Sequence, residues 1–94
     1  MRVTVRLFAR LRDLAGTGEL IREVPPHATA RQVRDDLVLE WPELREYAKT
    51  MSVAVNAEYA RMSADLHDGD EVAFMPPVSG GWAGSKPAPT YRKS

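Results

Sequence analysis

The chain has 94 residues, of which 44% are hydrophobic and 28% charged, a size that supports one domain with a modest core. Its 13 basic and 13 acidic residues balance overall, but the part after Gly81 carries Lys86, Arg92 and Lys93 and no acid. Residues 1–81 are therefore mildly acidic, which argues against a nucleic-acid-binding surface. Because the sequence has no cysteine, disulfides and a thiol catalyst are excluded.

The N-terminal segment alternates apolar and polar residues with a period of two. The apolar members of this pattern share one side: Val3, Val5 and Leu7. This alternation predicts a half-buried strand from Met1 to Phe8. The charged residues between them do not fit a secretory signal or a membrane span, so we expect a cytoplasmic protein with no membrane partner.

A short helical turn and a second strand come next. Residues 9–15 predict a helical turn, which Gly16 ends. Glu19–Val24 predicts the second strand, and the short connection favours a hairpin with the first. Pro25 and Pro26 end this strand, because proline cannot donate a backbone hydrogen bond to a neighbouring strand.

The main helix is predicted from Thr29 to about Glu40. Thr29 and Gln32 have the spacing of a capping box, in which two side chains satisfy two backbone amide donors. Apolar residues recur at helical spacing along one side of this segment: Val33, Leu37, Val38 and Trp41. Pro42 disfavours a continuous helix, and residues 42–49 predict a further short helical turn.

Two strands are predicted in the remainder of the body. Residues 51–57 predict the third strand, and Asn56–Glu58 reads as a turn that leads into Tyr59. The Asp-Gly-Asp sequence at 68–70 is a strong turn signal. Glu71–Met75 predicts the last strand, with alternate side chains on opposite faces.

The predicted order is strand, strand, helix, strand, strand. Because the helix supplies a crossover, the first and last strands can pair in parallel at the centre of the sheet. The fold class is therefore α+β, a β-grasp (ubiquitin-like) domain with one main helix packed across a four-stranded mixed sheet. We expect this domain to span residues 1–81, and residues 82–94, which are poor in apolar side chains, to be disordered. The predicted core comprises Val3, Val5, Leu7, Val33, Leu37, Val53, Val55, Val72 and Phe74.

The polar residues do not predict a metal site or a self-contained active site. His27 and His67 lie in predicted loops without nearby residues of metal-ligating spacing, so we expect solvated loop side chains. The acidic residues between positions 65 and 71 lack the alternation of a calcium loop and are expected to shape a turn. No bound metal or cofactor is expected.

The residues after the last strand form a distinct tail. Pro76 and Pro77 hold the chain extended, because proline fixes φ and restricts the residue before it. Gly80 and Gly81 have no Cβ, so their backbone could enter a channel too narrow for side chains. A Gly-Gly pair after a last strand can also be a flexible exit. The stiff segment before the pair favours a tail that presents a terminal carboxylate to the active site of another protein.

At these residues the sequence resembles the small, sulfur-carrying subunit of molybdopterin synthase. Three motifs within residues 1–81 carry the resemblance: LFARLRDLAG, VNAEYA and LHDGDEVAFMPPVSGG. A Gly-Gly pair alone is weak evidence, whereas a DGDEVAF strand that runs into PPVSGG is specific. The resemblance implies a carrier whose reactive group is the carboxylate of Gly81, with Gly80 beside it.

The family's chemistry implies two protein partners. An activating (E1-like) enzyme would use ATP to adenylate the Gly81 carboxylate, and sulfur would then displace the adenylate to give a thiocarboxylate. The tail would enter the large subunit of molybdopterin synthase, where the sulfur is transferred to a cyclic pterin monophosphate. The carrier would then be a substrate whose catalytic side chains lie on its partners, with no role for nucleic acid.

Strand alternation predicts a docking surface at the root of the tail. Leu7 and Phe74 face the core, so Phe8 and Met75 should face outward at the same end of two parallel strands. The resemblance adds Tyr59. Each of these could also be a singly exposed apolar residue. The other expected partner-binding residues are Pro76, Pro77 and Val78 in the tail, with Arg12 and Arg61 as a polar rim.

The chain departs from the family pattern after the glycine pair, because Trp82 follows Gly81 and leaves no free carboxylate there. Residues 82–94 could be removed from a precursor, belong to a longer fusion, or be foreign to the natural protein, and the sequence leaves all three open. The alternative functions are a related carrier such as the one of thiamine biosynthesis, a ubiquitin-like modifier joined to lysines through Gly81, and a plain interaction domain.

Overall fold

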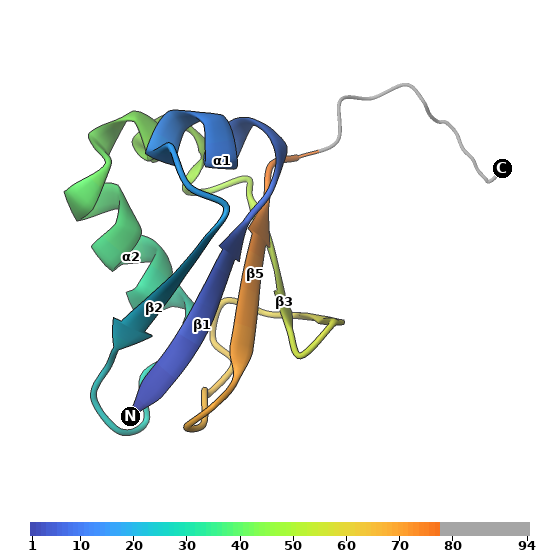
Figure 1. The fold of residues 1–94 in the computed structure, drawn as a ribbon. Helices are drawn as coiled ribbons and strands as arrows, with labels where there is room; N and C mark the ends of the chain where they lie inside the picture. Colours follow the sequence, from blue (N-terminus) through green and yellow to red (C-terminus); the bar gives the residue numbers. More distant parts are fainter. Residues whose placement is uncertain (78–94) are drawn as a thin grey trace, which may run out of the picture.

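The computed structural model describes residues 1–77, which form one sheet with its main helix on one side (Figure 1). The elements in chain order are β1 (Arg2–Leu7), α1 (Ala9–Ala15), β2 (Glu19–Glu23), α2 (Ala30–Glu40), the 3-10 helix η1 (Pro42–Tyr47), β3 (Ser52–Val55), β4 (Glu58–Ala60) and β5 (Glu71–Met75). The predicted elements are all present, with ends that differ from the predictions by one or two residues.

The strand order in the sheet is β2-β1-β5-β3-β4. β1 runs antiparallel to β2 and parallel to β5, with Val5 opposite Val72 and Leu7 opposite Phe74. β3 runs antiparallel to both β5 and β4. The first and last strands are therefore central neighbours, and the β-grasp prediction is confirmed.

The predicted strand number was wrong, because the sheet of the described residues has five strands rather than four. The additional strand is β4, which pairs with β3 through a two-residue hairpin loop, Asn56-Ala57. Both loop residues have positive φ, 52° and 71°, as the favoured tight hairpin turn requires. The loop has Ala where glycine is usual, and three residues are too few for a periodic signal, so the sequence pattern showed only a turn.

The start of α2 has the predicted capping box. The Thr29 backbone N–H donates to Gln32 Oε1 at 2.8 Å, and the Gln32 N–H donates to Thr29 Oγ1 at 3.3 Å. The helix ends at Glu40, the N–H of the C-cap residue Trp41 donates to the Leu37 carbonyl, and η1 begins at Pro42 as expected. This pair of elements is the crossover that makes the β1–β5 pairing parallel.

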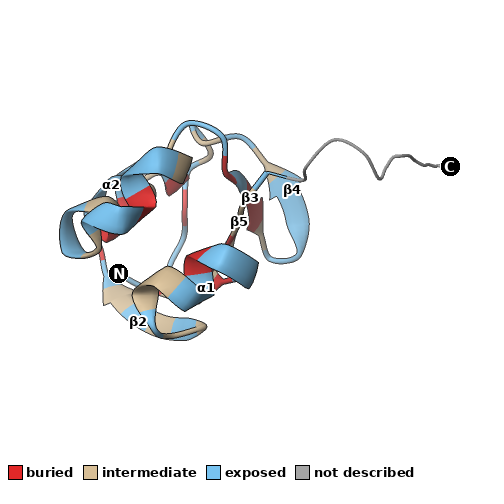
Figure 2. Cartoon of the chain, turned by 90° about the horizontal axis from the view of Figure 1, so that it is seen from above, coloured by how far each residue is buried: buried red, intermediate tan, exposed pale blue. Residues whose placement is uncertain are grey.

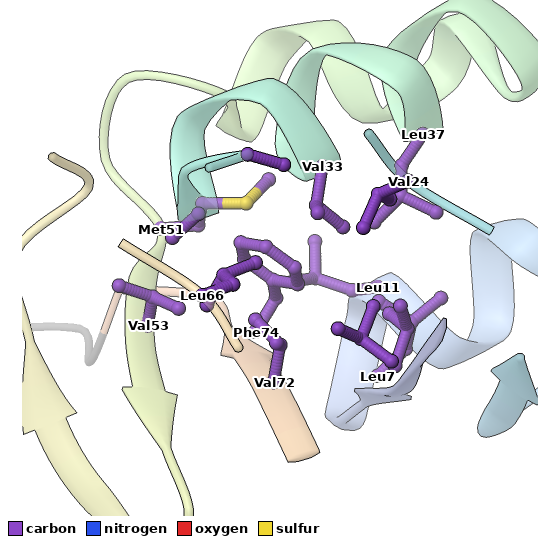
Figure 3. Packing of buried hydrophobic residues seen from close by; sticks show 14 of the residues in the cluster. Leu7, Leu11, Val24, Val33, Leu37, Met51, Val53, Leu66, Val72 and Phe74 are labelled. Atoms are coloured by element: carbon purple, nitrogen blue, oxygen red, sulfur yellow. The ribbon is translucent and has the colours of Figure 1, made fainter. Parts of the chain in front are cut away.

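The core lies between α2 and one face of the sheet, here called the inner face (Figure 2). Phe74 is fully buried within it, surrounded by side chains from α2, the neighbouring strands and the connections (Figure 3). Eight of the nine predicted core residues are buried, and Val55 is only half-buried, because it is the last residue of β3 and faces exposed Glu58. The connections and the short helices supply further buried residues that the strand and helix patterns did not predict: Leu11, Val24, Leu44, Met51 and Leu66.

Candidate functional site

The carboxyl ends of β1 and β5 meet at one end of the sheet, and the chain leaves β5 there toward the tail (Figure 1). The Phe8 backbone N–H donates to the Phe74 carbonyl at 3.2 Å and ties the two strand ends together. The two carboxyl ends meet because β1 and β5 are parallel, and parallel strands finish at the same edge of a sheet. Phe8 therefore lies beside the root of the tail.

Phe8 leaves the strand on the face of the sheet opposite α2, here called the outer face. Leu7 before it is buried in the core, and the chain turns into α1 at Ala9, whose φ is 52°. The Phe8 side chain is 38% exposed. The prediction that Phe8 faces outward is confirmed by this geometry, and its role in binding remains a prediction.

Met75 is the outer-face neighbour of Phe8. It follows buried Phe74, is half-buried, and pairs with Ser52 of β3. Because Leu7 lies opposite Phe74 in the register, the next residue of each strand comes to the same edge, as predicted. The structure thus brings two apolar side chains of the predicted docking surface together where Pro76 begins the tail.

Tyr59 lies on the same face but farther from the tail. It belongs to β4, is 78% exposed, and pairs with Ala54, which in turn pairs with Ala73 of β5. Two strand spacings, roughly 10 Å, separate it from β5. The small side chain of Ala54 lies between Tyr59 and β5 in this row of the sheet. We call Phe8, Met75 and Tyr59 together the docking patch.

The two predicted rim residues lie on opposite flanks of the sheet. Arg12 is exposed on α1, and its side chain lies against Gly18 before β2, where an added Cβ would come within 2.9 Å of the Arg12 Cδ. Arg61 is exposed directly after β4. Since β2 and β4 are the two edge strands, the structure does not bring these arginines together.

The tail is described only at its root. Pro76 is half-buried and Pro77 is exposed. The predictions for Val78, for Gly80 and Gly81 and for residues 82–94 lie outside the described residues.

Sequence reasoning missed a polar network on the outer face that reaches the docking patch. Arg6 Nη1 donates to Glu71 Oε2 at 3.0 Å, and the Arg6 guanidinium carbon lies 5.4 Å from the centre of the Phe8 ring. The Glu71 N–H donates to Asn56 Oδ1 at 3.0 Å. The alternation of the first strand placed Arg6 on this face, but its partner lies 65 positions away and depends on the strand pairing.

Asp70 anchors the other end of this network. Burial of Asp70 disfavours its charged form, but hydrogen bonds from the Asn56 side chain and the His67 backbone N–H, with the His67 ring nearby, outweigh that effect. The pKa of Asp70 is consequently lower than its ordinary value. These bonds measure 2.9 Å from Asn56 Nδ2 and 2.8 Å from His67 N, and they tie the hairpin loop to the start of β5.

Residues 1–77 contain no group of three or more histidine, cysteine or acidic side chains that could hold a metal ion. His27 and His67 are both exposed in loops, as expected. Asp68 accepts a 2.7 Å hydrogen bond from the Arg2 N–H, so the acidic stretch shapes a turn as predicted. A shallow hollow at the far end of β1, away from the tail, is lined by Met1, Arg2, Thr4, Glu23, Asp68 and Gly69.

Among the described helices, none has the length and apolar character needed to cross a bilayer.

The fold and the site define a class: a β-grasp domain whose central last strand delivers the chain to a tail beside an exposed apolar patch. Comparison with known proteins agrees, because the sequence profile of the ThiS family matches residues 5–81. The chain belongs to the ThiS family. The match ends at the second glycine of the pair.

Three similar proteins illustrate the relationship. The chain is 40% identical over 79 residues to the molybdopterin synthase sulfur carrier subunit of Arabidopsis thaliana, covering 84% of this chain and 82% of that protein. It is 32% identical to the solved structure of a Pyrococcus furiosus protein described as putative molybdopterin converting factor, subunit 1, with a TM-score of 0.73 over 83% of this chain and 99% of that one. It is 29% identical to small archaeal modifier protein 1 of Haloferax volcanii, with a TM-score of 0.71 over 82% and 98% of the two chains.

Proposed function

We propose that this chain is a sulfur carrier of molybdopterin biosynthesis, the small subunit of a molybdopterin synthase. The observation that carries the proposal is the position of β5: it lies at the centre of the sheet and leads through two prolines to Gly80 and Gly81, where the family match ends. The name of the Arabidopsis relative supports the pathway.

The chemistry takes place at the terminal carboxylate of Gly81. The carboxylate oxygen attacks the α-phosphorus of ATP on an activating enzyme, releasing pyrophosphate and leaving an acyl-adenylate. Hydrosulfide delivered by the sulfur donor then attacks the acyl carbon and displaces AMP, which leaves the thiocarboxylate. The large subunit accepts this tail and transfers the sulfur to a cyclic pterin monophosphate. Because ATP drives the first step, we place the carrier in the cytoplasm.

This proposal requires a chain that ends at Gly81. The 94-residue chain and a form ending at Gly81 can each be incubated with the activating enzyme, ATP and a sulfur donor, and their intact masses measured. We expect only the shorter form to gain the mass of one sulfur in place of one oxygen. Equal loading of the chain that ends at Ser94 would overturn the requirement.

The matched variant for this experiment is Gly81→Ala in the shorter form. Its methyl group should clash in a channel shaped for bare backbone and impair loading or transfer. The intact mass of the protein from its native cell would also show whether residues 82–94 are removed before the carrier works.

A second candidate function is protein modification. The likeness to the archaeal modifier protein favours it, because a modifier uses the same activated carboxylate and passes it to a lysine amine instead of accepting sulfur. Mass spectrometry of cell extract separates the two functions. A carrier appears as a thiocarboxylate of the free chain, whereas a modifier appears as larger conjugates.

A further inference from the structure

Arg6 occupies the outer face of β1 two residues before Phe8, so both side chains point to the same side of the sheet. Its side chain is 42% exposed, and its guanidinium carbon lies 5.4 Å from the centre of the Phe8 ring. This separation is within the range in which a cation is attracted to an aromatic face. Arg6 is therefore a direct neighbour of the docking patch.

An ion pair with Glu71 holds the Arg6 guanidinium on the side that faces away from Phe8. Its Nη1 atom donates to Glu71 Oε2 at 3.0 Å, and Glu71 itself is held at its backbone by Asn56. The residue opposite Arg6 on β5 is Ala73, whose small side chain leaves room for the guanidinium to reach Glu71, two residues earlier on the same strand. Glu71 is thus an anchor that sets where the guanidinium lies.

The Nε atom of Arg6 gains no hydrogen bond in this placement, because it is enclosed and has no hydrogen-bond partner among residues 1–77. An enclosed donor without a partner is unfavourable. The contact with the Phe8 ring and the ion pair with Glu71 are the interactions that offset it.

We infer that Arg6 is a positioning residue for docking. Anchored by Glu71, it holds the Phe8 ring against the outer face beside the tail root, so that the docking patch is formed before a partner arrives. Such preorganisation strengthens binding because less side-chain freedom is lost on association. The inference rests on the proposed function for the identity of the partner, but the position of the ring can be measured without one.

The first test uses the isolated protein. The sequence has only two phenylalanines, Phe8 and Phe74, so incorporation of 4-fluorophenylalanine gives two ¹⁹F resonances, which the variant Phe8→Leu assigns. Arg6→Gln should shift the Phe8 resonance and leave that of buried Phe74 in place. Movement of both resonances would indicate a general structural role, and an unchanged Phe8 resonance would mean that Arg6 does not hold the ring. Either result would overturn the inference.

Two further variants complete this test. Glu71→Gln removes the anchor while keeping Arg6, and it should move the Phe8 resonance in the same direction as Arg6→Gln. Arg2→Gln is the matched control, because Arg2 lies on the same strand and face and pairs with Glu23 at 2.8 Å, but at the end far from Phe8. It should leave both resonances unchanged.

The second test is a double-mutant cycle on binding to the large subunit of the synthase. Arg6→Gln should weaken binding about two- to fivefold when Phe8 is present, the amount expected for an exposed cation–aromatic contact. It should have no effect in the Phe8→Ala background, because Arg6 acts through Phe8. Equal weakening in both backgrounds would make Arg6 a direct partner contact and overturn the positioning role.

The two tests fail separately. If the unsubstituted chain, ending at Gly81, does not bind the large subunit while Arg6→Gln still shifts the Phe8 resonance, the proposed function is wrong and the placement of the ring by Arg6 stands.

Discussion

Three residues of the described chain, one beside Phe8 and two in the β3–β4 hairpin loop, have backbone conformations that L-residues seldom adopt. Ala9 follows Phe8 with φ at 52°, and Asn56 and Ala57 form the hairpin loop with φ at 52° and 71°. Asparagine tolerates this region because its short polar side chain can bond locally, as Asn56 does with Asp70, whereas alanine gains no such compensation. Strain of this kind persists where the surrounding structure fixes the chain.

Ala57→Gly should therefore stabilise the protein. Glycine removes the steric cost of positive φ but adds freedom to the unfolded chain, so the net gain is up to about 1 kcal/mol in the free energy of unfolding. Urea unfolding measures it. Ala48→Gly is the control, because Ala48 has an ordinary helical φ of −57° and should lose stability instead. A loss of stability in both variants would contradict the assigned loop geometry.

The docking patch gives a second prediction at this scale. Phe8→Ala and Met75→Ala should each weaken binding to the large subunit or to the activating enzyme by about 1 kcal/mol or more, because apolar contacts at an interface centre carry much of the affinity. Calorimetric titration measures the change.

The control for the docking prediction is Ile21→Ala. Ile21 is 61% exposed, more than Phe8, and also lies on the outer face, but it belongs to edge strand β2 away from the tail. Its removal should leave both affinities unchanged. If all three variants bind equally well, the tail alone mediates recognition.

At the level of elements, the β3–β4 hairpin is fastened to β5 by its loop. The Asn56 N–H donates to the Glu71 carbonyl at 2.8 Å, its side-chain oxygen accepts from the Glu71 N–H, and its side-chain nitrogen donates to Asp70. One loop residue thus connects two elements, and the same Glu71 pairs with Arg6 on β1. These bonds therefore link the hairpin, through Glu71 and Arg6, to Phe8 of the docking patch.

This fastening predicts a dependence of stability on pH. A carboxylate whose pKa is lower in the folded than in the unfolded protein stabilises the fold above the unfolded pKa of about 3.9, and this contribution is lost as the pH falls through the folded pKa. Asp70 is such a group. Asp70→Asn should therefore destabilise the protein at about pH 7 and lose most of that effect at about pH 2.

Urea unfolding of the Asp70 variant at both pH values tests this prediction. Asp36→Asn, an exposed change on α2, is the control and should alter stability little at either pH. A destabilisation by Asp70→Asn that is the same at both pH values would show that the charge of Asp70 is unimportant.

For the whole molecule, one strand combines the functional and the stabilising roles. β5 lies between β1 and β3, its inner-face residue Phe74 is fully buried in the core, and its end leads to the tail. The tail is therefore attached to the central strand of the sheet, which pairs with a neighbour on both sides. A partner that binds the tail would therefore bind a segment whose first residue is held by the central strand of the sheet.

Phe74→Ala should cost about 3–5 kcal/mol, a large part of the 5–15 kcal/mol that typically stabilises a domain. Thermal unfolding followed by circular dichroism measures the loss. Phe74→Leu should cost less, because it leaves a smaller cavity. A Phe74→Ala protein with an unchanged Tm would mean that the core is not organised around this ring.

Much of this architecture was predictable because its signals are local. The alternation of β1, the capping box at Thr29 and the apolar side of α2 each lie within a few consecutive residues, and such patterns predicted these elements and eight of the buried core residues. The parallel pairing of the first and last strands followed from the crossover helix, since a strand that returns through a helix comes back in the same direction.

The sequence by itself determined four of the five strands of the described residues, the main helix, the inward and outward sides of β1 and β5, and the two prolines that follow β5. Only the tertiary structure decided that β4 exists, that Tyr59 lies two strands from β5, and that Arg6 pairs with Glu71 beneath the Phe8 ring. The physical reason is the distance along the chain over which each signal extends. The three residues of β4 are too few to show an alternating pattern of apolar and polar side chains. Contacts between residues 65 positions apart arise only when the whole sheet sets their register.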